Sequence, residues 1–262
     1  MRHPPPITSR SNLRVKALRA AAAGRASAPG ELTALEGEHL LAEAAAAGVE
    51  LDAVFLREGD EDRWEGPALR GLCAREHFVL SRDVFDSAVG TATPQGIAGL
   101  LAIPVVKPAS PEAPGPVLVL QDVQDPGNVG TLIRSAAAFG AAQVCLVGDC
   151  ANPWSPKVLR SSAGAVFRVP VSRVSLQDAL SSKGSRRVFA SVVSGSRAVL
   201  STAADLTSPM LLVGSEGRGL SPEALAAADE HVTVPCRIES LNAAVAGSLL
   251  LYESFRQGEG RA

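Results

Sequence analysis

Short apolar runs alternate with segments of helical length along the second half of the chain. Runs at residues 117–120, 143–147, 166–169, 188–193, 210–213 and 231–234 have the length and composition of buried strands. Between and after them, residues 129–139, 155–162, 175–182, 222–227 and 241–256 are expected to be helices. Strands and helices that alternate in this way predict an α/β fold with a mostly parallel sheet and helices on both of its faces.

The first part of the chain has its own, shorter pattern. We expect helices at 12–23, 36–47, 66–75 and 84–88, and strands at 51–56, 78–80 and 96–103. Residues 104–116 are rich in proline and lack periodicity, which is typical of a linker. The sequence therefore predicts a small α/β domain over residues 1–103, a linker over 104–116 and a larger domain over 117–262.

Composition and cysteine placement exclude several classes of protein. No apolar run reaches the length of about 18 residues that a membrane span needs, and the N-terminus lacks the apolar stretch of a secretion signal. We therefore expect a cytoplasmic protein that does not enter a membrane. Cys73, Cys145, Cys150 and Cys236 form no C-x-x-C pair and no histidines cluster near them, so we expect reduced thiols and no metal site.

The net charge of −2 conceals an uneven distribution of charge. Residues 1–30 contain arginine and lysine but no acidic residue, and residues 157–187 are also strongly basic. Residues 31–66, in contrast, are acidic. Local basic patches indicate phosphate binding more directly than mean charge does. On charge alone, however, these stretches are equally compatible with ordinary solvated faces.

The segment 118–142, LVLQDVQDPGNVGTLIRSAAAFGAA, carries the first candidate for chemistry. It predicts a buried strand, a polar turn, and a helix that ends at Gly140. In an open α/β sheet, the turn that follows a strand faces the ligand crevice. Asn128 and Arg134 flank this turn, so both are candidate site residues.

Two later segments place polar residues at equivalent positions. In LLVGSEGRGL (211–220), Glu216 stands among glycines that allow a ligand to approach the backbone. Further on, Ser240 and Asn242 open the last helix, where either residue also suits a helix cap. The chain has no G-x-G-x-x-G after the strand at 117–120, no phosphate-binding loop and no G-x-S-x-G. The three junctions therefore suit chemistry that needs only positioning and charge stabilisation.

These segments resemble the motifs of the SpoU/TrmH family of RNA ribose 2′-O-methyltransferases, within the SPOUT superfamily. DPGNVGTLIRSAAAFG, VGSEGRGL and VPCRIESLNAAVAGSLLLYE resemble the family's three motifs in their order and spacing. The resemblance implies an α/β fold with a C-terminal trefoil knot, S-adenosylmethionine as cofactor and a homodimer. It also implies methylation of a ribose 2′-hydroxyl in RNA, for which we expect 23S rRNA as substrate.

Carried over residue by residue, the resemblance assigns two sets of positions. The catalytic set is Asn128, Arg134, Glu216, Ser240 and Asn242. The cofactor-binding set is Gly214, Glu216, Gly217, Val234, Pro235, Leu241 and Asn242. Residues 236–239 depart from the family, because many relatives have a longer loop with a glycine there. Since a guanidinium stays protonated in proteins, we expect Arg134 to stabilise negative charge on the ribose oxygen and an adjacent phosphate, rather than to act as a base.

The first domain resembles, more weakly, the family's N-terminal substrate-binding domain of L30e-like fold. For this domain we expect RNA contacts from Arg10, Asn12, Arg14 and Lys16. Two alternatives remain open for the whole chain. One is a tRNA methyltransferase of the same superfamily, and the other is a non-catalytic RNA-binding relative.

Overall fold

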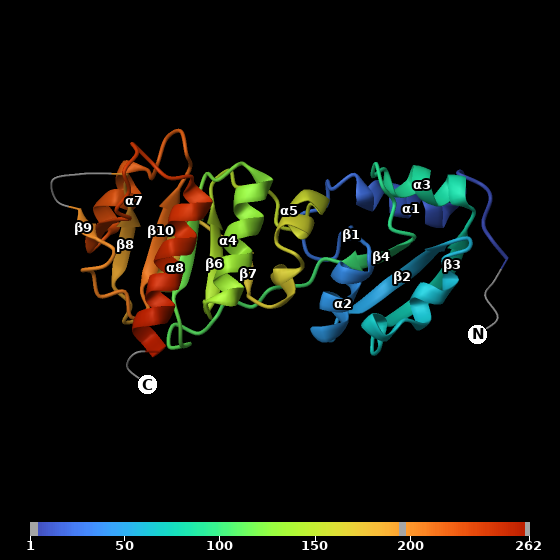
Figure 1. The fold of residues 1–262 in the computed structure, drawn as a ribbon, viewed down its shortest axis with the longest axis horizontal. Coiled ribbons are helices and arrows are strands. Elements are labelled where there is room, and N and C mark those ends of the chain that lie inside the picture. The colour runs from blue at the N-terminus through green and yellow to red at the C-terminus, as the bar shows by residue number, and fades with distance from the viewer. Residues whose placement is uncertain (1–4, 194–197, 260–262) are drawn as a thin grey trace. The chain divides into compact units, whose positions relative to one another are not determined.

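The chain folds into two compact units in the computed structural model, which describes residues 5–193 and 198–259 (Figure 1). The first unit comprises Met1–Val105 together with Asn152–Phe167, and the second comprises Val106–Ala151 and Arg168–Ala262. The sequence assigned 152–167 to the second domain. The structure groups them with the first unit because Trp154, Val158 and Leu159 are buried there. In addition, the Thr33 hydroxyl donates to the carbonyl of Trp154 at 2.8 Å.

The first unit is a four-stranded mixed sheet with helices packed against it. The order of its strands is β1-β4-β2-β3, in which β4 is antiparallel to β1 and β2, and β3 is parallel to β2. Buried residues of α1, α3 and the sheet, such as Leu18, Phe55 and Phe85, form its core. Its elements are α1 (Leu13–Ala22), β1 (Leu32–Glu36), α2 (Glu38–Ala46), β2 (Glu50–Arg57), η1 (Glu61–Glu65), η2 (Pro67–Leu69), β3 (Cys73–Leu80), α3 (Arg82–Val89), β4 (Ile97–Ala102), α5 (Pro156–Ser161) and η3 (Ala165–Phe167).

Two sequence predictions for this unit are wrong. The helix expected at 66–75 is a short 3₁₀ turn followed by β3, because Gly71 takes a positive φ of 86° and stops any helix there. The strand β1 was missed. Its five residues precede α2 directly, and the sequence reading merged Glu36 into that helix.

The second unit is built on a seven-stranded sheet of the described strands, paired in parallel throughout. The order is β7-β6-β5-β10-β8-β11-β9. Strands β5 and β10 are neighbours although they are far apart in sequence, and β6 flanks β5 on its other side. Its elements are β5 (Val117–Gln121), α4 (Pro126–Ala138), β6 (Gln143–Val147), β7 (Val171–Arg173), α6 (Leu176–Ser181), β8 (Val188–Ser191), β9 (Val199–Leu200), β10 (Met210–Gly214), α7 (Pro222–Ala227), β11 (Glu230–Thr233) and α8 (Ala243–Glu259).

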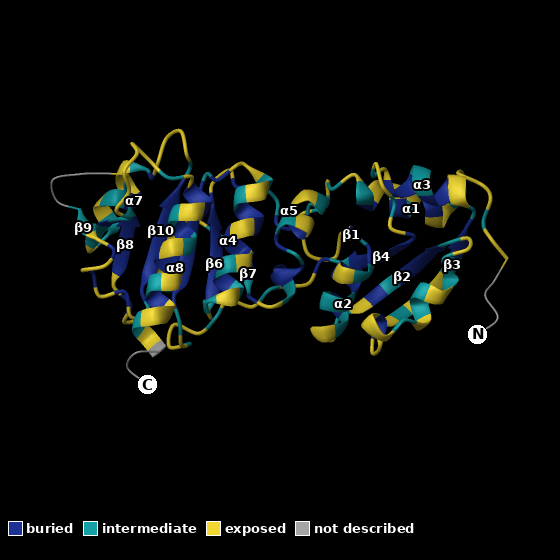
Figure 2. Cartoon of the chain, viewed as in Figure 1, coloured by how far each residue is buried: buried dark blue, intermediate teal, exposed yellow. Residues whose placement is uncertain are grey.

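Helices cover both faces of this sheet. The long helices α4 and α8 lie side by side on one face (Figure 1), and the hydroxyls of Ser135 and Ser248 join them at 2.7 Å. A methyl group at Gly247 would lie 2.5 Å from Leu132, so glycine permits this close packing. Helices α6 and α7 contribute Ala179 and Ala224 to the core on the other face. The central strands are accordingly buried along their length (Figure 2).

The strand expected at 166–169 is also wrong. Ala163 and Gly164 both take positive φ, and the chain makes a 3₁₀ turn before β7 begins at Val171, after Pro170. The short strand β9 was missed as well, since two residues carry no periodicity. The predicted fold class, an α/β fold with a mostly parallel sheet, is confirmed, whereas the trefoil knot stays a prediction.

The predicted linker has no helix or strand in its described residues, but it is held in place. The guanidinium of Arg186, a buried side chain, donates to the carbonyls of Pro111 at 2.5 Å and Gly115 at 3.2 Å, and to that of Ala113. The amide of Ala109 donates to Gln143 Oε1 at 2.8 Å. Residues 106–116 are therefore part of the second unit. Among the described helices, none combines the length and the apolar character that a membrane crossing requires.

Candidate functional site

The carboxyl ends of β5 and β10 meet at the same edge of the sheet of the second unit. Gly214, the last residue of β10, pairs with Gln121, the last residue of β5. The chain leaves β5 toward β6 on one side, whereas β10 lies on the other side, so this is the point at which the strand order switches. Ligands bind at such a point in open α/β sheets. The turns that carry Asn128 and Glu216 therefore face one crevice.

Three of the predicted residues join in a chain of hydrogen bonds there. Asn128 Nδ2 donates to Glu216 Oε1, and Asn128 Oδ1 accepts from Asn242 Nδ2 at 3.1 Å. Asn242 Oδ1 in turn accepts from the backbone amides of Ala244 at 2.9 Å and Val245 at 3.2 Å at the start of α8. Asn128 thus connects two segments that lie 88 and 114 residues away from it in sequence.

The backbone at the start of α4 fixes where Asn128 lies. Asp125 is the N-cap of the helix, and its Oδ1 accepts from the Asn128 amide at 2.8 Å. Pro126 follows at the first helical position, which suits its fixed φ. Asp125, and not Asn128, therefore caps this helix. The Asn128 side chain remains available for Glu216 and Asn242.

A cavity of about 630 Å³ opens beside this hydrogen-bonded chain. Of the predicted cofactor-binding residues, Gly214, Glu216, Gly217, Val234, Leu241 and Asn242 line it. Pro235 does not, and its neighbour Cys236 takes that place in the wall. Ser240 also lines the cavity, and its hydroxyl makes no hydrogen bond within the part of the chain that the structure describes.

The loop 214–219 is tightly closed on itself. The amide of Gly219 donates to the carbonyl of Ser215 at 2.9 Å, and Gly219 takes a positive φ of 66°. A methyl group at Gly214 would overlap the carbonyl group of Gly219 and lie 2.5 Å from the backbone nitrogen of Leu220. Glycine at 214 is therefore required by space, and at 219 by conformation.

Arg134 does not join the cluster. It is exposed on α4 and makes no hydrogen bond or ion pair with any residue that the structure describes. It stands six residues after Asn128, which is about 9 Å further along the helix and roughly 120° around it. The two side chains therefore leave different faces of α4. Among the described residues, none of Glu216, Asn128 and Ser240 makes a hydrogen bond to Arg134.

Several lining residues were missed by the sequence reading. Ser191 is the last residue of β8, which pairs with both β10 and β11, and Val192 and Val193 follow it. Residues at the carboxyl ends of adjacent parallel strands line the same crevice, so the strand order is the signal that would have identified these residues. Arg218, in the glycine loop, also lines the cavity and was read only as part of a motif.

Of the four residues proposed to contact RNA in the first unit, Asn12 and Arg14 already have partners within the chain. Asn12 caps α1 by accepting from the Arg14 amide at 2.8 Å. Arg14 pairs with Glu76, and its guanidinium lies 5.5 Å from the centre of the Phe78 ring. Arg10 and Lys16 are exposed. Across residues 5–193 and 198–259, no group of three or more histidine, cysteine or acidic residues is arranged to hold a metal ion.

Comparison with known proteins gives consistent matches. The profile of the SpoU rRNA Methylase family matches residues 115–252. The chain is 34% identical to the 23S rRNA (guanosine(2553)-2′-O)-methyltransferase RlmP of Bacillus subtilis, over 83% of this chain and 86% of that protein. It is 33% identical to an uncharacterised tRNA/rRNA methyltransferase of Synechocystis, over 96% and 93% of the two chains.

A solved structure extends the match to both units. The AdoMet-bound rRNA methyltransferase from Sinorhizobium meliloti superposes with a TM-score of 0.78 at 26% identity, covering 96% of this chain and 97% of that one. The family profile alone spans more than half of the chain, and the matched residues include the whole hydrogen-bonded cluster. This chain belongs to the SpoU rRNA methylase family.

Proposed function

We propose that this protein methylates a ribose 2′-hydroxyl of RNA, with S-adenosylmethionine as methyl donor and 23S rRNA as substrate. The observation that carries this proposal is the chain of hydrogen bonds from Glu216 through Asn128 to Asn242 at the edge of the glycine-lined cavity. The relative RlmP, named for 2′-O-methylation of 23S rRNA, supports the choice of both reaction and substrate.

The cavity suits S-adenosylmethionine in size and lining. Its volume of about 630 Å³ lies within the range of sites for small organic ligands, roughly 300–1,000 Å³. Val192, Leu220 and Leu225 offer an apolar wall for a flat base, and the glycine loop offers backbone groups at close range. When bound, the cofactor supplies a methyl group already activated on a sulfonium sulfur.

Because the methyl group is already activated, the residues of this chain have to position the ribose and stabilise the negative charge on its 2′-oxygen. Asn128, held by Glu216 and Asn242, offers a fixed amide at the edge of the cavity and orients the ribose. Ser240 offers a free hydroxyl from the opposite loop. Arg134 leaves α4 on another face and does not line the cavity, so we assign it to the RNA side of the site. There its protonated guanidinium holds the adjacent phosphate and stabilises the developing negative charge on the 2′-oxygen. The proton of the hydroxyl passes to a phosphate oxygen or to water.

The reaction is tested with purified protein, S-adenosylmethionine carrying a tritiated methyl group, and unmodified 23S rRNA. We expect label in the RNA and, after nuclease digestion and mass analysis, a nucleoside methylated on its ribose. A methylated base would instead favour a base-modifying tRNA enzyme of the superfamily, to be tested with tRNA. No transfer to either RNA would favour a non-catalytic RNA-binding relative.

We assign substrate recognition to the first unit, as an L30e-like domain that contacts RNA through Arg10, Asn12, Arg14 and Lys16. Exposed cations at the start of α1 support this assignment, since phosphate contacts dominate affinity for nucleic acids. Substitution of Arg10 and Lys16 by alanine should weaken RNA binding in a filter assay while calorimetry finds cofactor affinity unchanged. Equal loss of both affinities would contradict the assignment.

We further propose that the protein is a cytoplasmic homodimer that pairs through α8. Val245, Leu249 and Tyr252 follow one another at helical spacing, and each is 42–48% exposed. Phe139 packs its ring against Tyr252 at 5.7 Å and extends this apolar stripe onto α4. A second copy would cover the stripe. Leu249→Asp should give monomers in analytical ultracentrifugation, whereas Gln177→Asp, at an exposed position on α6, should not.

A further inference from the structure

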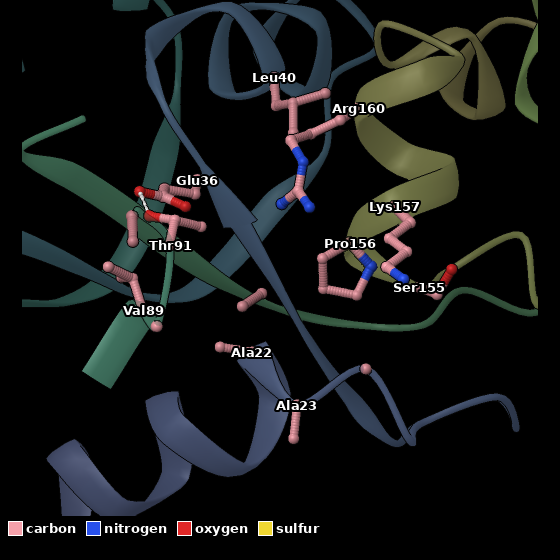
Figure 3. A pocket seen from close by; sticks show the side chains of 14 residues that line it. Ala22, Ala23, Glu36, Leu40, Val89, Thr91, Ser155, Pro156, Lys157 and Arg160 are labelled. Atoms are coloured by element: carbon pink, nitrogen blue, oxygen red, sulfur yellow. Dashed lines mark hydrogen bonds between the residues drawn. The ribbon is translucent and has the colours of Figure 1, made fainter. Parts of the chain in front are cut away.

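A cavity in the first unit is the strongest unassigned feature of the molecule (Figure 3). It measures about 240 Å³ and lies among the end of α1, strands β1 and β4, the end of α3, and α5. It exists because the residues around it are small: Ala22, Ala34 and Ala98 line it where larger side chains would fill the space. Leu40 and Val89 complete an apolar interior.

Two cations at the cavity come from a distant part of the sequence. Lys157 and Arg160 lie on α5, which belongs to the basic stretch 157–187 but packs in the first unit. Figure 3 shows Arg160 reaching into the space that faces Glu36 and Thr91. Both cations are exposed, and neither makes a hydrogen bond or ion pair with the described residues of the chain. They are therefore free to bind an anion.

One acidic group faces them from the opposite wall. Glu36 Oε1 accepts from the Thr91 hydroxyl at 2.8 Å and from the Gln95 amide at 3.1 Å, so the carboxylate is fixed in place. A carboxylate held in this way accepts a hydrogen bond from an exocyclic amino group of a nucleobase. The cavity thus combines an apolar interior, one fixed acceptor and two free cations.

We propose that this cavity binds one unpaired nucleotide of the RNA substrate, with its base inside and its phosphate on Lys157 and Arg160. The proposal rests on the proposed function. The volume is below that of sites for drug-sized ligands and suits a single flat group. Sequence-specific RNA recognition takes unpaired bases out of the helix in this way. The Glu36 carboxylate favours a base that carries an amino group over uracil.

The test measures filter binding of the full-length protein to unmodified 23S rRNA transcribed in vitro, across a series of salt concentrations. Lys157→Ala combined with Arg160→Ala should weaken binding about 30-fold. It should also lower the slope of log affinity against log salt by about 0.7, since the two cations hold one phosphate and each phosphate of a single strand contributes about 0.7. Arg70→Ala combined with Arg82→Ala, two exposed cations of the same unit outside the cavity, is the matched control.

A second pair of variants separates insertion of a base from simple charge attraction. Ala22→Leu fills the cavity and keeps every charge, so it should weaken binding while the salt slope stays unchanged. Ala20→Leu, on the exposed side of the same helix, should bind as the wild type does. Thermal unfolding and calorimetric affinity for S-adenosylmethionine check that each variant is folded and retains its cofactor site.

The outcomes separate the proposal from the function on which it rests. If the wild type does not bind this RNA, the proposed substrate is wrong and the inference fails with it. If the wild type binds and the cationic double variant binds equally well, the inference alone fails. If the cationic double variant loses RNA affinity but Ala22→Leu does not, the two cations form a surface patch that binds phosphate without insertion of a base. That result also overturns the inference. Micromolar binding of free 5′-mononucleotides would identify a small-molecule site instead.

Discussion

The glycine loop of the cofactor cavity allows two substitutions of the same size to be compared at one site. In Gly214→Ala, the new methyl group would overlap the backbone of Gly219 and Leu220, which cannot rotate away as a side chain can. Forced overpacking of this kind costs about 2 kcal/mol of stability. For a unit of this size, such a loss lowers the melting temperature by roughly 4–8 °C. Displacement of the loop should also weaken cofactor binding by at least tenfold.

Gly217→Ala is the matched control. Gly217 also lines the cavity, but no heavy atom lies within 4 Å of a methyl group placed there. We expect its stability to change by less than about 0.5 kcal/mol. Calorimetric titration with S-adenosylmethionine and thermal unfolding measure both effects. If Gly214→Ala is as stable as Gly217→Ala and binds the cofactor equally well, the space argument for Gly214 is refuted.

The remaining predictions concern three other parts of the molecule. Arg134→Ala should bind S-adenosylmethionine normally but lose at least 100-fold in methyl transfer to rRNA, since Arg134 does not line the cavity; near-normal turnover would exclude its proposed role. Burial raises the pKa of Cys145 to about 11, so only about one thiol in a thousand is ionised at pH 8. Burial also raises the pKa of Cys150, so a thiol reagent should label Cys73 and Cys236 rapidly and the other two only after denaturation. Rapid reaction of four thiols in the native protein would contradict this burial. Arg186→Ala leaves the linker carbonyls without their donor and should cost about 3 kcal/mol in denaturant unfolding. An unchanged midpoint of denaturant unfolding would mean that water hydrogen-bonds to these carbonyls in place of the guanidinium, with no loss of stability.

The sequence predicted the parts of the site that follow directly from local pattern. Asn128 and Glu216 each follow a buried strand, and Asn242 opens a helix, so their common location at one sheet edge follows once the sheet is parallel. Arg134 was grouped with Asn128 because both stand in one motif. The helical repeat nevertheless places them about 120° apart around α4, on different faces of the helix.

Other features depended on contacts that no local pattern contains. Residues 152–167 have an ordinary helical pattern, and only their packing against β1 and α2 assigns them to the first unit. That Cys236 rather than Pro235 lines the cavity likewise depends on the path of the backbone through residues 235–240, which no local pattern predicts. Such details are set by tertiary packing, which overrides short-range preference.

The membership of residues 152–167 in the first unit has a consequence for synthesis of the chain. When residue 105 leaves the ribosome, the buried side chains of Trp154 and Leu159 have not yet been made. At about 5–20 residues per second, the remaining 62 residues up to Phe167 take roughly 3–12 s to translate. During that interval, part of the apolar surface of residues 1–105 stays exposed to solvent. We expect a nascent chain stalled at residue 105 to be protease-sensitive and to bind chaperones.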